Sequence, residues 1–368
     1  MRLPGFPRRA VEVDVAVVGS GLPALAAALE LSRRGSRVAV VGARPEDRSR
    51  GLGLALLGPG RPYARVVRAL GRAEARLVWA AGCENHLRLR ALVEEAGRGC
   101  GYAARGSFLL AVRRSEAEEL AESEDMLRDD GFPGEFLDHY MLETRFDLSG
   151  FPGAYWAAED AEVDAGLLAS LLGERTRDAG VAFPAGAVQA IAPDASFVSV
   201  DTEAGRIRAA SALVATDGAA AALVPALRPL LRPAAGICLR TRLLGGAVVP
   251  TAVRTADGRF AWQAADGSVL LCGIGAAEGG EGSLEAFATR LPVEAASARA
   301  REDEAEVSVD GLPLVGRLPG PPLAVACGFG ALSPGFAFAA ARWAADALLS
   351  GADPTPEPLR ATRRPGLV

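Results

Sequence analysis

Gly19, Gly21 and Ala24 form a G-x-G-x-x-A pattern near the start of the chain, in the segment GSGLPA that also holds Leu22 and Pro23. This spacing is typical of loops that bind the pyrophosphate of a dinucleotide. The first glycine permits a tight turn, the second lets the backbone approach the phosphates, and a small third residue lets a helix pack on a strand. The N–H groups at the start of that helix favour negative charge. The alternative is a glycine-rich turn that binds nothing.

The segments around this loop predict a strand, a helix and a second strand. An apolar run at residues 13–18 predicts the first strand, residues 36–41 predict the second, and the residues between them repeat apolar side chains at helical spacing. Gly42 stands where the second strand of such a unit usually ends in an acid that binds the ribose. Ala43 and Arg44 follow, and Arg44 is compatible with a 2′-phosphate. Either other groups hold the ribose, or the nucleotide binds more weakly.

Later segments also join short apolar strands to glycines. The loop at residues 51–60 contains four glycines that would let backbone lie against a flat or phosphorylated ligand; an ordinary flexible loop is the alternative. Residues 212–218 predict a buried strand that runs into a glycine turn. Residues 309–351 predict a strand, a glycine-rich loop and a long alanine-rich helix, whose N-terminus can face a ligand.

The remaining chain predicts mixed secondary structure. A helical repeat covers residues 63–97, alternation at 187–200 predicts a β-meander, and Asp-Gly pairs between apolar runs predict hairpins at 248–273. Residues 299–306 are highly charged and are interpreted as a connection. The segment after Asp353 is rich in Pro and Arg, so we expect a disordered tail over residues 353–368.

Composition excludes several classes of function. The net charge of -5 gives no support for nucleic-acid binding, and no stretch is apolar enough to span a membrane or to serve as a secretory signal. All 40 basic residues are Arg, so Schiff-base chemistry by Lys is excluded. The five cysteines are scattered and there are two histidines, so we expect reduced thiols, a cytoplasmic protein and no zinc site.

The motifs GSGLPA, LVATDGA (213–219), DGLPLVGRLPG (310–320) and ACGFGALSPGFAFAAA (326–341) occur in this order. Together they resemble the D-amino-acid oxidase superfamily of FAD-dependent amine and amino-acid oxidoreductases, which includes glycine oxidase and sarcosine oxidase. The resemblance implies an α/β fold, with a Rossmann-like FAD-binding domain and a second, mostly antiparallel β-sheet substrate domain.

The resemblance also implies domain bounds and a site. Residues 1–100, 155–235 and 305–352 would form the FAD-binding domain, and residues 101–154 and 236–304 the substrate domain. The implied cofactor-binding residues are Gly19, Gly21, Leu22, Pro23, Ala24, Gly42, Ala43, Arg44, Gly51, Gly53, Val188, Thr216, Gly218, Gly316, Gly328, Gly330, Gly335 and Phe336.

Two departures from the family pattern bear on the site, beside Gly42. The family often carries an Arg shortly before D-G-L-P that binds a substrate carboxylate. Here Arg299 and Arg301 are weak candidates for that role, because they lie at a shifted distance from the motif. The alternative is that this charged segment is simply exposed to solvent. Several oxidases of the family keep a Lys beside flavin N5 to assist the reaction with oxygen, and this chain has none. A dehydrogenase that passes electrons to a quinone or a partner protein is therefore slightly favoured over an oxidase.

The function implied by the resemblance is oxidation of the C–N bond of an amino acid or secondary amine by hydride transfer to flavin N5, after which the imine hydrolyses in water. No protein acid or base is required for this chemistry. Two alternatives stay open: a divergent FAD-binding subunit without independent turnover, and an FAD dehydrogenase of a hydroxy acid or glycerol phosphate. The expected partners are a small-molecule substrate and an electron acceptor.

Overall fold

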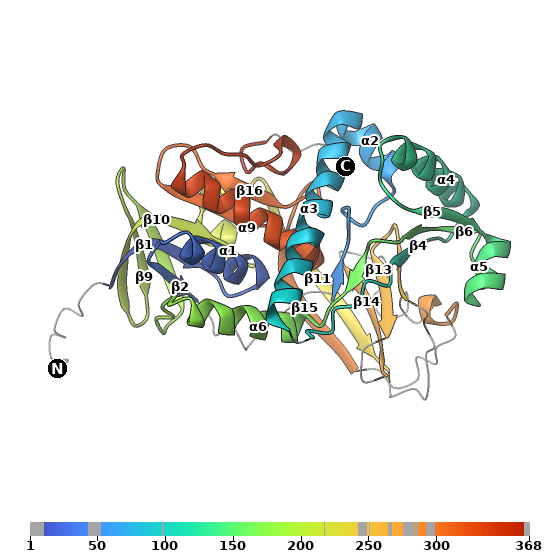
Figure 1. The fold of residues 1–368 in the computed structure, drawn as a ribbon, viewed down its shortest axis with the longest axis horizontal. Coiled ribbons are helices and arrows are strands. Elements are labelled where there is room, and N and C mark those ends of the chain that lie inside the picture. The colour runs from blue at the N-terminus through green and yellow to red at the C-terminus, as the bar shows by residue number, and fades with distance from the viewer. Residues whose placement is uncertain are drawn as a thin grey trace.

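Two large β-sheets, a two-stranded sheet and the surrounding helices make up the described fold, which confirms the predicted α/β class (Figure 1). The computed structural model describes residues 11–42, 53–97, 99–216, 218–241, 249, 251–263, 267–274, 284, 286–291 and 299–363. No helix in these ranges is long and apolar enough to cross a membrane.

The first sheet has seven strands, and its centre is parallel. Its path runs through β16 (Leu314–Arg317), β17 (Leu323–Cys327), β10 (Gly205–Val214), β1 (Val11–Val18) and β2 (Val38–Val41), and β8 (Val188–Pro193) and β9 (Val198–Thr202) join at β10. Val15 and Val17 of β1 pack on one face, whereas Ala16 and Val18 pack on the other. Because both faces are covered, the C-terminal ends of β1 and β10 are apolar and buried.

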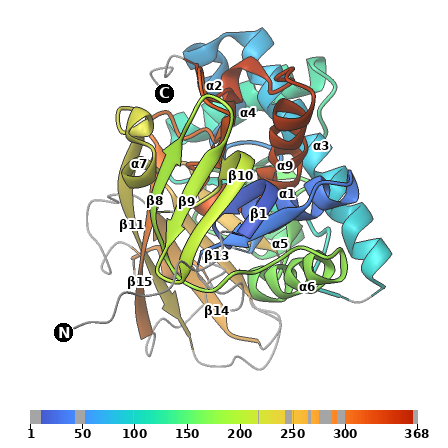
Figure 2. The same ribbon diagram turned by 90° about the vertical axis from the view of Figure 1, so that its left-hand side faces the viewer.

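Helices cover one face of this sheet, and the β8–β9 hairpin covers the other, as Figure 2 shows. The covering helices are α1 (Leu22–Arg33), α3 (Arg72–Ala96), α6 (Ala165–Asp178) and α9 (Ser333–Leu349). α9 packs against both α1 and α3, and its small alanines allow this close approach. The predicted helical segment 63–97 is two helices, α2 (Tyr63–Leu70) and α3, because Gly71 adopts φ 93° between them.

The second sheet has eight strands and is antiparallel except where β12 pairs with β4. Its strands in spatial order are β15 (Arg299–Ser308), β11 (Leu231–Arg240), β14 (Val269–Ile274), β13 (Arg259–Gln263), β12 (Ala252–Thr255), β4 (Ser107–Ala111), β6 (Gly153–Ala157) and β5 (Glu135–Asp138). One face packs on α5 (His139–Phe146) and on apolar residues of 284–291, and α4 (Arg114–Asp129) packs beside β4 and β6. Short elements complete the fold: β3 (Leu54–Ala55), β7 (Ala161–Glu162), α7 (Ala220–Leu223), η2 (Pro225–Leu227), η3 (Gly330–Leu332) and η4 (Glu357–Leu359).

Two sequence expectations are wrong. Residues 299–306 belong to strand β15, not to a connection. Residues 353–363 are ordered, because Leu359 is fully buried and Arg363 forms two hydrogen bonds of 2.8 Å with the carboxylate of Asp310. The rest of the expected disordered tail, residues 364–368, lies outside the described residues.

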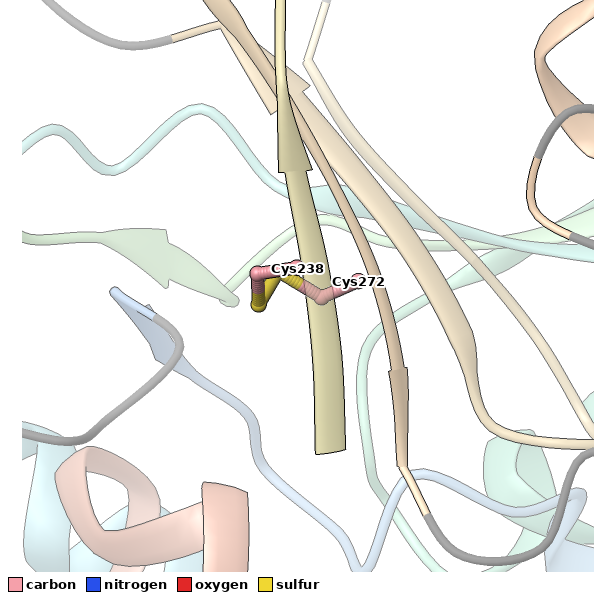
Figure 3. Close-up of a disulfide and its surroundings, with 2 residues drawn as sticks. All are labelled: Cys238 and Cys272. Atoms are coloured by element: carbon pink, nitrogen blue, oxygen red, sulfur yellow. A yellow bond between two sulfur atoms is a disulfide. The ribbon is translucent and has the colours of Figure 1, made fainter. Parts of the chain in front are cut away.

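Two of the five cysteines form a disulfide. Cys238 on β11 and Cys272 on β14 lie directly opposite each other, with 4.1 Å between their Cα atoms, and their sulfur atoms are bonded (Figure 3). The expectation of reduced thiols is therefore wrong for this pair, while Cys83, Cys100 and Cys327 form no disulfide. Because disulfides are rare in the cytosol, the cysteine argument for a cytoplasmic protein no longer holds.

Candidate functional site

The loops after β1, β2 and β10 meet at the carboxyl ends of these parallel strands, where ligands bind in open α/β sheets. The Gly19 N–H donates to the Val41 carbonyl at 2.8 Å, and the Ala215 N–H donates to the Val18 carbonyl at 2.8 Å. Gly19 has φ 131°, and a Cβ there would lie 2.1 Å from the Ala215 carbonyl oxygen. No other residue type fits this position without moving the loop.

The start of α1 is free of side-chain capping. Gly21 is the N-cap residue, Pro23 lies in the first turn, and no side chain accepts a hydrogen bond from the first-turn N–H groups. No acidic residue lies in that turn, so its positive end is not neutralised locally. Leu22 and Ala24 are buried beneath the loop. This geometry fits a phosphate group.

The neighbouring predicted residues have different surroundings. The Thr216 hydroxyl, just after β10, is buried and has no hydrogen-bond partner, so it is a polar group that a ligand could satisfy. Gly42 adopts φ 140°, so replacement by Glu would strain the backbone. Gly218 is exposed, and Val188 packs in the apolar cluster on the β8–β9 side of the sheet. Ala43, Arg44 and Gly51 lie outside the described residues.

Several predicted glycines make close contacts with the protein itself. A Cβ at Gly53 would lie 2.0 Å from the Val163 carbonyl oxygen, and one at Gly335 would lie 2.7 Å from the Leu56 carbonyl oxygen. A Cβ at Gly316 would lie 2.3 Å from the Asp353 carboxylate. Close packing within the protein is therefore sufficient to explain why these three positions are glycine, and it does not test whether they bind the cofactor. Phe336 is likewise buried in the helix-side core.

Asn85 of α3 holds the start of α9. Its side-chain amide donates to the Pro334 carbonyl at 2.8 Å, and its side-chain oxygen accepts from the Phe338 N–H at 2.8 Å. No side chain caps the helix at Leu332. α9 therefore presents its N-terminal turn in a fixed position beside the loop at 328–332.

A cavity of about 230 Å³ opens where this loop meets the second sheet. Gly328, Phe329 and Gly330 line it from the first sheet, and Ala234 and Phe260 line it from the second. Gly328 and Gly330 have φ of 73° and 53°, and a Cβ on either would meet β11 or β15 at under 3.0 Å. The loop that follows β17 thus contacts strands of the second sheet at these glycines, so the cavity lies at the junction of the two sheets.

Polar groups also line this cavity: Arg61, Arg232, Asp257 and Ser308. Burial lowers the pKa of Arg61 from its ordinary value, and the positive charges of Arg65 and Arg232 lower it further, whereas the negative charge of Asp310 opposes this shift. Asp257 is paired with Arg259, and although burial opposes this, the pairing lowers the pKa of the Asp257 carboxyl. Asp257 therefore stays ionised but already has a cationic partner.

A buried ion pair fixes the segment that carries Arg61. Arg254 of β12 lies 3.3 Å from the carboxylate of Asp160, and Ser107 donates to the same carboxylate at 2.6 Å. The other oxygen of Asp160 accepts from the Leu57 N–H at 2.8 Å. Asp160 thus ties residues 57–61 to the second sheet.

The candidates Arg299 and Arg301 lie on β15, opposite Arg240 and Cys238 of β11. The described part of the structure does not place their side chains. Arg61 and Arg232 line the cavity, and sequence reasoning missed both. No motif marks either residue, because loop 57–61 and strand β11 come together only in the folded protein.

Comparison with known proteins decides the family. A profile described as DAO, FAD dependent oxidoreductase, matches residues 14–347. The chain belongs to this family. The resemblance drawn from the sequence is therefore confirmed, and FAD is the cofactor of this DAO-family protein.

Solved structures of other DAO-fold proteins are similar over nearly the whole chain. Glycine oxidase from Geobacillus kaustophilus has 25% identity and a TM-score of 0.79, covering 97% of this chain and 100% of that one. L-amino acid deaminase from Proteus vulgaris has 18% identity and a TM-score of 0.77, covering 99% and 97%. L-proline dehydrogenase from P. horikoshii has 17% identity and a TM-score of 0.73, covering 94% and 96%. A search of curated proteins finds no match.

The residues at the strand ends fit FAD. The uncapped first turn of α1 suits a pyrophosphate, and the unpartnered Thr216 hydroxyl is a buried polar group that lacks a partner in the protein. Gly19 and Gly42, both at positive φ, keep the loop ends free of side chains.

Proposed function

We propose that this protein oxidises the C–N bond of a small amino acid or secondary amine. The observation that carries the proposal is the cavity where the loop after β17 meets β11 and β13. The cavity of about 230 Å³ also borders Gly328 and Gly330, which the family resemblance assigns to the cofactor, so the part left for a substrate favours a small molecule. The names of the similar solved structures, glycine oxidase, L-amino acid deaminase and L-proline dehydrogenase, agree with this substrate class.

We assign FAD binding to the seven-stranded sheet with its helices, and substrate binding to the eight-stranded sheet. The bounds drawn from the sequence at 235 and 305 would divide β11 and β15. Both strands pair along their whole length within the eight-stranded sheet, which supports placing them entirely in the substrate part. Gly19, Gly21, Thr216 and the start of α9 are the residues proposed to hold the cofactor.

Bound FAD supplies the hydride-accepting chemistry. The chain supplies binding and orientation, because no Lys, His, Cys or Tyr is among the described residues that line the cavity. Asp257, the carboxylate there, is already paired with Arg259. The proton released when a substrate ammonium becomes a neutral amine therefore goes to solvent water in this proposal. The N-terminal turn of α9 would favour negative charge beside the cavity.

We further propose a dehydrogenase rather than an oxidase. Reduction of oxygen begins with superoxide, which a nearby compact cation stabilises, and the chain has no Lys to provide one. Arg has a delocalised charge and replaces an ammonium poorly. Rapid mixing of the reduced protein with air-saturated buffer tests this proposal. Flavin reoxidation over minutes, with fast oxidation by an artificial quinone, would support it, and reoxidation at the rate of turnover would refute it.

The test of the main proposal is anaerobic flavin reduction. The FAD-loaded protein is mixed with a panel of amino acids and secondary amines, and bleaching of the flavin absorbance is followed. We expect bleaching by at least one small member of the panel. Bleaching by dithionite but by no amine would contradict the proposal and favour a subunit without turnover. The Gly21→Val variant is the control, since a branched side chain at the start of α1 should abolish FAD binding.

A further inference from the structure

Arg61 is a half-buried cation that forms no salt bridge with the described residues, although the nearby Asp310 carboxylate favours its charge. Among the residues that the structure describes, its guanidinium makes no hydrogen bond and no ion pair. It lies over Gly311, where a Cβ would be 3.1 Å from Arg61 Nη2. Gly311 has φ 76°, so glycine there serves both the turn and the space for the guanidinium. A partly buried guanidinium without a salt bridge is a suitable contact for an anionic ligand.

A second arginine faces the same cavity. Arg232 of β11 also has no ion pair among the described residues, and it lies near enough to Arg61 to disfavour that residue's charge. Ser308, on the neighbouring strand, is 1% exposed, and although it lies near Asp310, its hydroxyl makes no hydrogen bond of normal geometry. Arg61 and Arg232 therefore line the same cavity, and neither has a salt bridge among the described residues.

The other arginines around this cavity are already neutralised. Arg65 pairs with Glu119, Arg259 pairs with Asp257, and Arg363 pairs with Asp310. The carboxylates nearest the cavity, Asp257 and Asp310, are thus occupied by partners other than Arg61 and Arg232. Arg61 and Arg232 are therefore the two arginines of the cavity lining that form no salt bridge among the described residues, enough to contact one carboxylate each.

We propose that Arg61 and Arg232 each bind one carboxylate of a substrate that carries two, so that the preferred substrates are small amines or amino acids with two acid groups. This rests on the proposed function, because it takes the same cavity as the substrate site. It moves the carboxylate contact from β15, where the sequence suggested Arg299 or Arg301, to the loop before α2 and to β11.

The test is binding of simple dianions, which requires no turnover. The FAD-loaded protein is titrated calorimetrically with malonate, succinate and glutarate, and with acetate, propionate and butyrate as matched monoanions. Each charge-assisted contact is worth roughly 10- to 100-fold in affinity. We therefore expect the best dianion to bind at least about 10-fold more tightly than every monoanion. Equal affinity for dianions and monoanions would overturn the proposal.

Variants identify the residues. Arg61→Gln and Arg232→Gln should each remove most of the preference for the dianion, and Arg61→Lys should retain part of it. Arg68→Gln is the control with the same charge change, since Arg68 is paired with Glu119 and Glu122 and does not line the cavity. Arg232 is exposed, so its variant will fold even if Arg61 variants do not. An equal loss in the Arg68 variant, or no loss in the Arg232 variant, would overturn the assignment.

The binding data and the flavin assay separate this inference from the proposed function. Tight dianion binding without flavin reduction by any amine would keep the anion site and refute the function. Flavin reduction by monocarboxylate amines, with no preference for dianions, would keep the function and refute the anion site.

Discussion

The buried pair of Asp160 and Arg254 offers a direct test of what joins the loop 57–61 to the second sheet. Asp160 is 1% exposed and Arg254 is 6% exposed. Burial lowers the pKa of Arg254, and the charge of Asp160 opposes that effect. Asp160→Asn keeps the shape and an oxygen for the Leu57 N–H, but it leaves the Arg254 charge without a counter-ion. Removing one member of a buried pair costs about 3–5 kcal/mol.

This loss is measurable as a fall in the melting temperature. An unfolding entropy of about 2.1 cal/mol/K per residue gives about 0.77 kcal/mol/K for 368 residues, so the melting temperature should fall by about 4–6 °C. Differential scanning fluorimetry of the FAD-loaded protein measures it. Asp201→Asn is the matched control, because Asp201 pairs with Arg206 at the surface and such pairs contribute about 0–1 kcal/mol.

A double variant tests whether the loss of stability comes from the unpaired charge of Arg254. Asp160→Asn combined with Arg254→Met removes both charges, and replacing a buried pair by apolar groups is often nearly neutral. It should therefore melt above the single Asp160→Asn variant. If Asp160→Asn melts no lower than Asp201→Asn, or if the double variant is the least stable of all, the pair does not carry the stability assigned to it.

Three further predictions follow from single contacts. Gly19→Ala should lose FAD, seen as a colourless purified protein, because its Cβ would collide with the Ala215 carbonyl; a fully loaded variant would refute the loop assignment. Thiol titration of the denatured protein should find three reactive thiols, and five would show that the Cys238–Cys272 bond is absent. Reduction of this disulfide, which closes a loop of 34 residues, should lower the free energy of unfolding by roughly 3–4 kcal/mol. Burial opposes ionisation of Asp310, but the hydrogen bonds and charge of Arg363 outweigh burial and lower the pKa of the Asp310 carboxyl. The stability that this pair contributes is therefore fully present above the ordinary Asp pKa of about 3.9, and it is lost as the pH falls through the lowered pKa. Arg363→Ala should thus destabilise more at pH 7 than at pH 3 in urea titrations, and equal losses at both would contradict this.

Local patterns in the sequence predicted the parts of the fold that depend on local geometry. The turn at Gly19 needs positive φ and no Cβ, and both requirements are visible as a glycine between a strand and a helix. Strand β15 was missed because its charges suggest a loop, yet it is the edge strand of its sheet, where charged side chains are tolerated.

The missed parts depend on contacts between distant segments. The order of residues 353–363 comes from the Arg363–Asp310 pair, and the disulfide joins cysteines that only the register of β11 and β14 brings together. Arg61 and Arg232 belong to segments 171 positions apart (232 minus 61), so no window of sequence shows them as one site. Each segment considered alone has the pattern of an ordinary charged surface.

The order of strands in the first sheet has a consequence for synthesis on the ribosome. β1 lies between β2 and β10, and β10 begins at Gly205, 187 residues after Val18 (205 minus 18). At about 5–20 residues per second, roughly 10–40 s pass before this neighbour is made. During that time β1 and β2 have an unpaired edge, and the apolar face that β8 and β9 will cover stays open. The nascent chain should therefore need a chaperone to hold its N-terminal third until the middle of the protein has emerged.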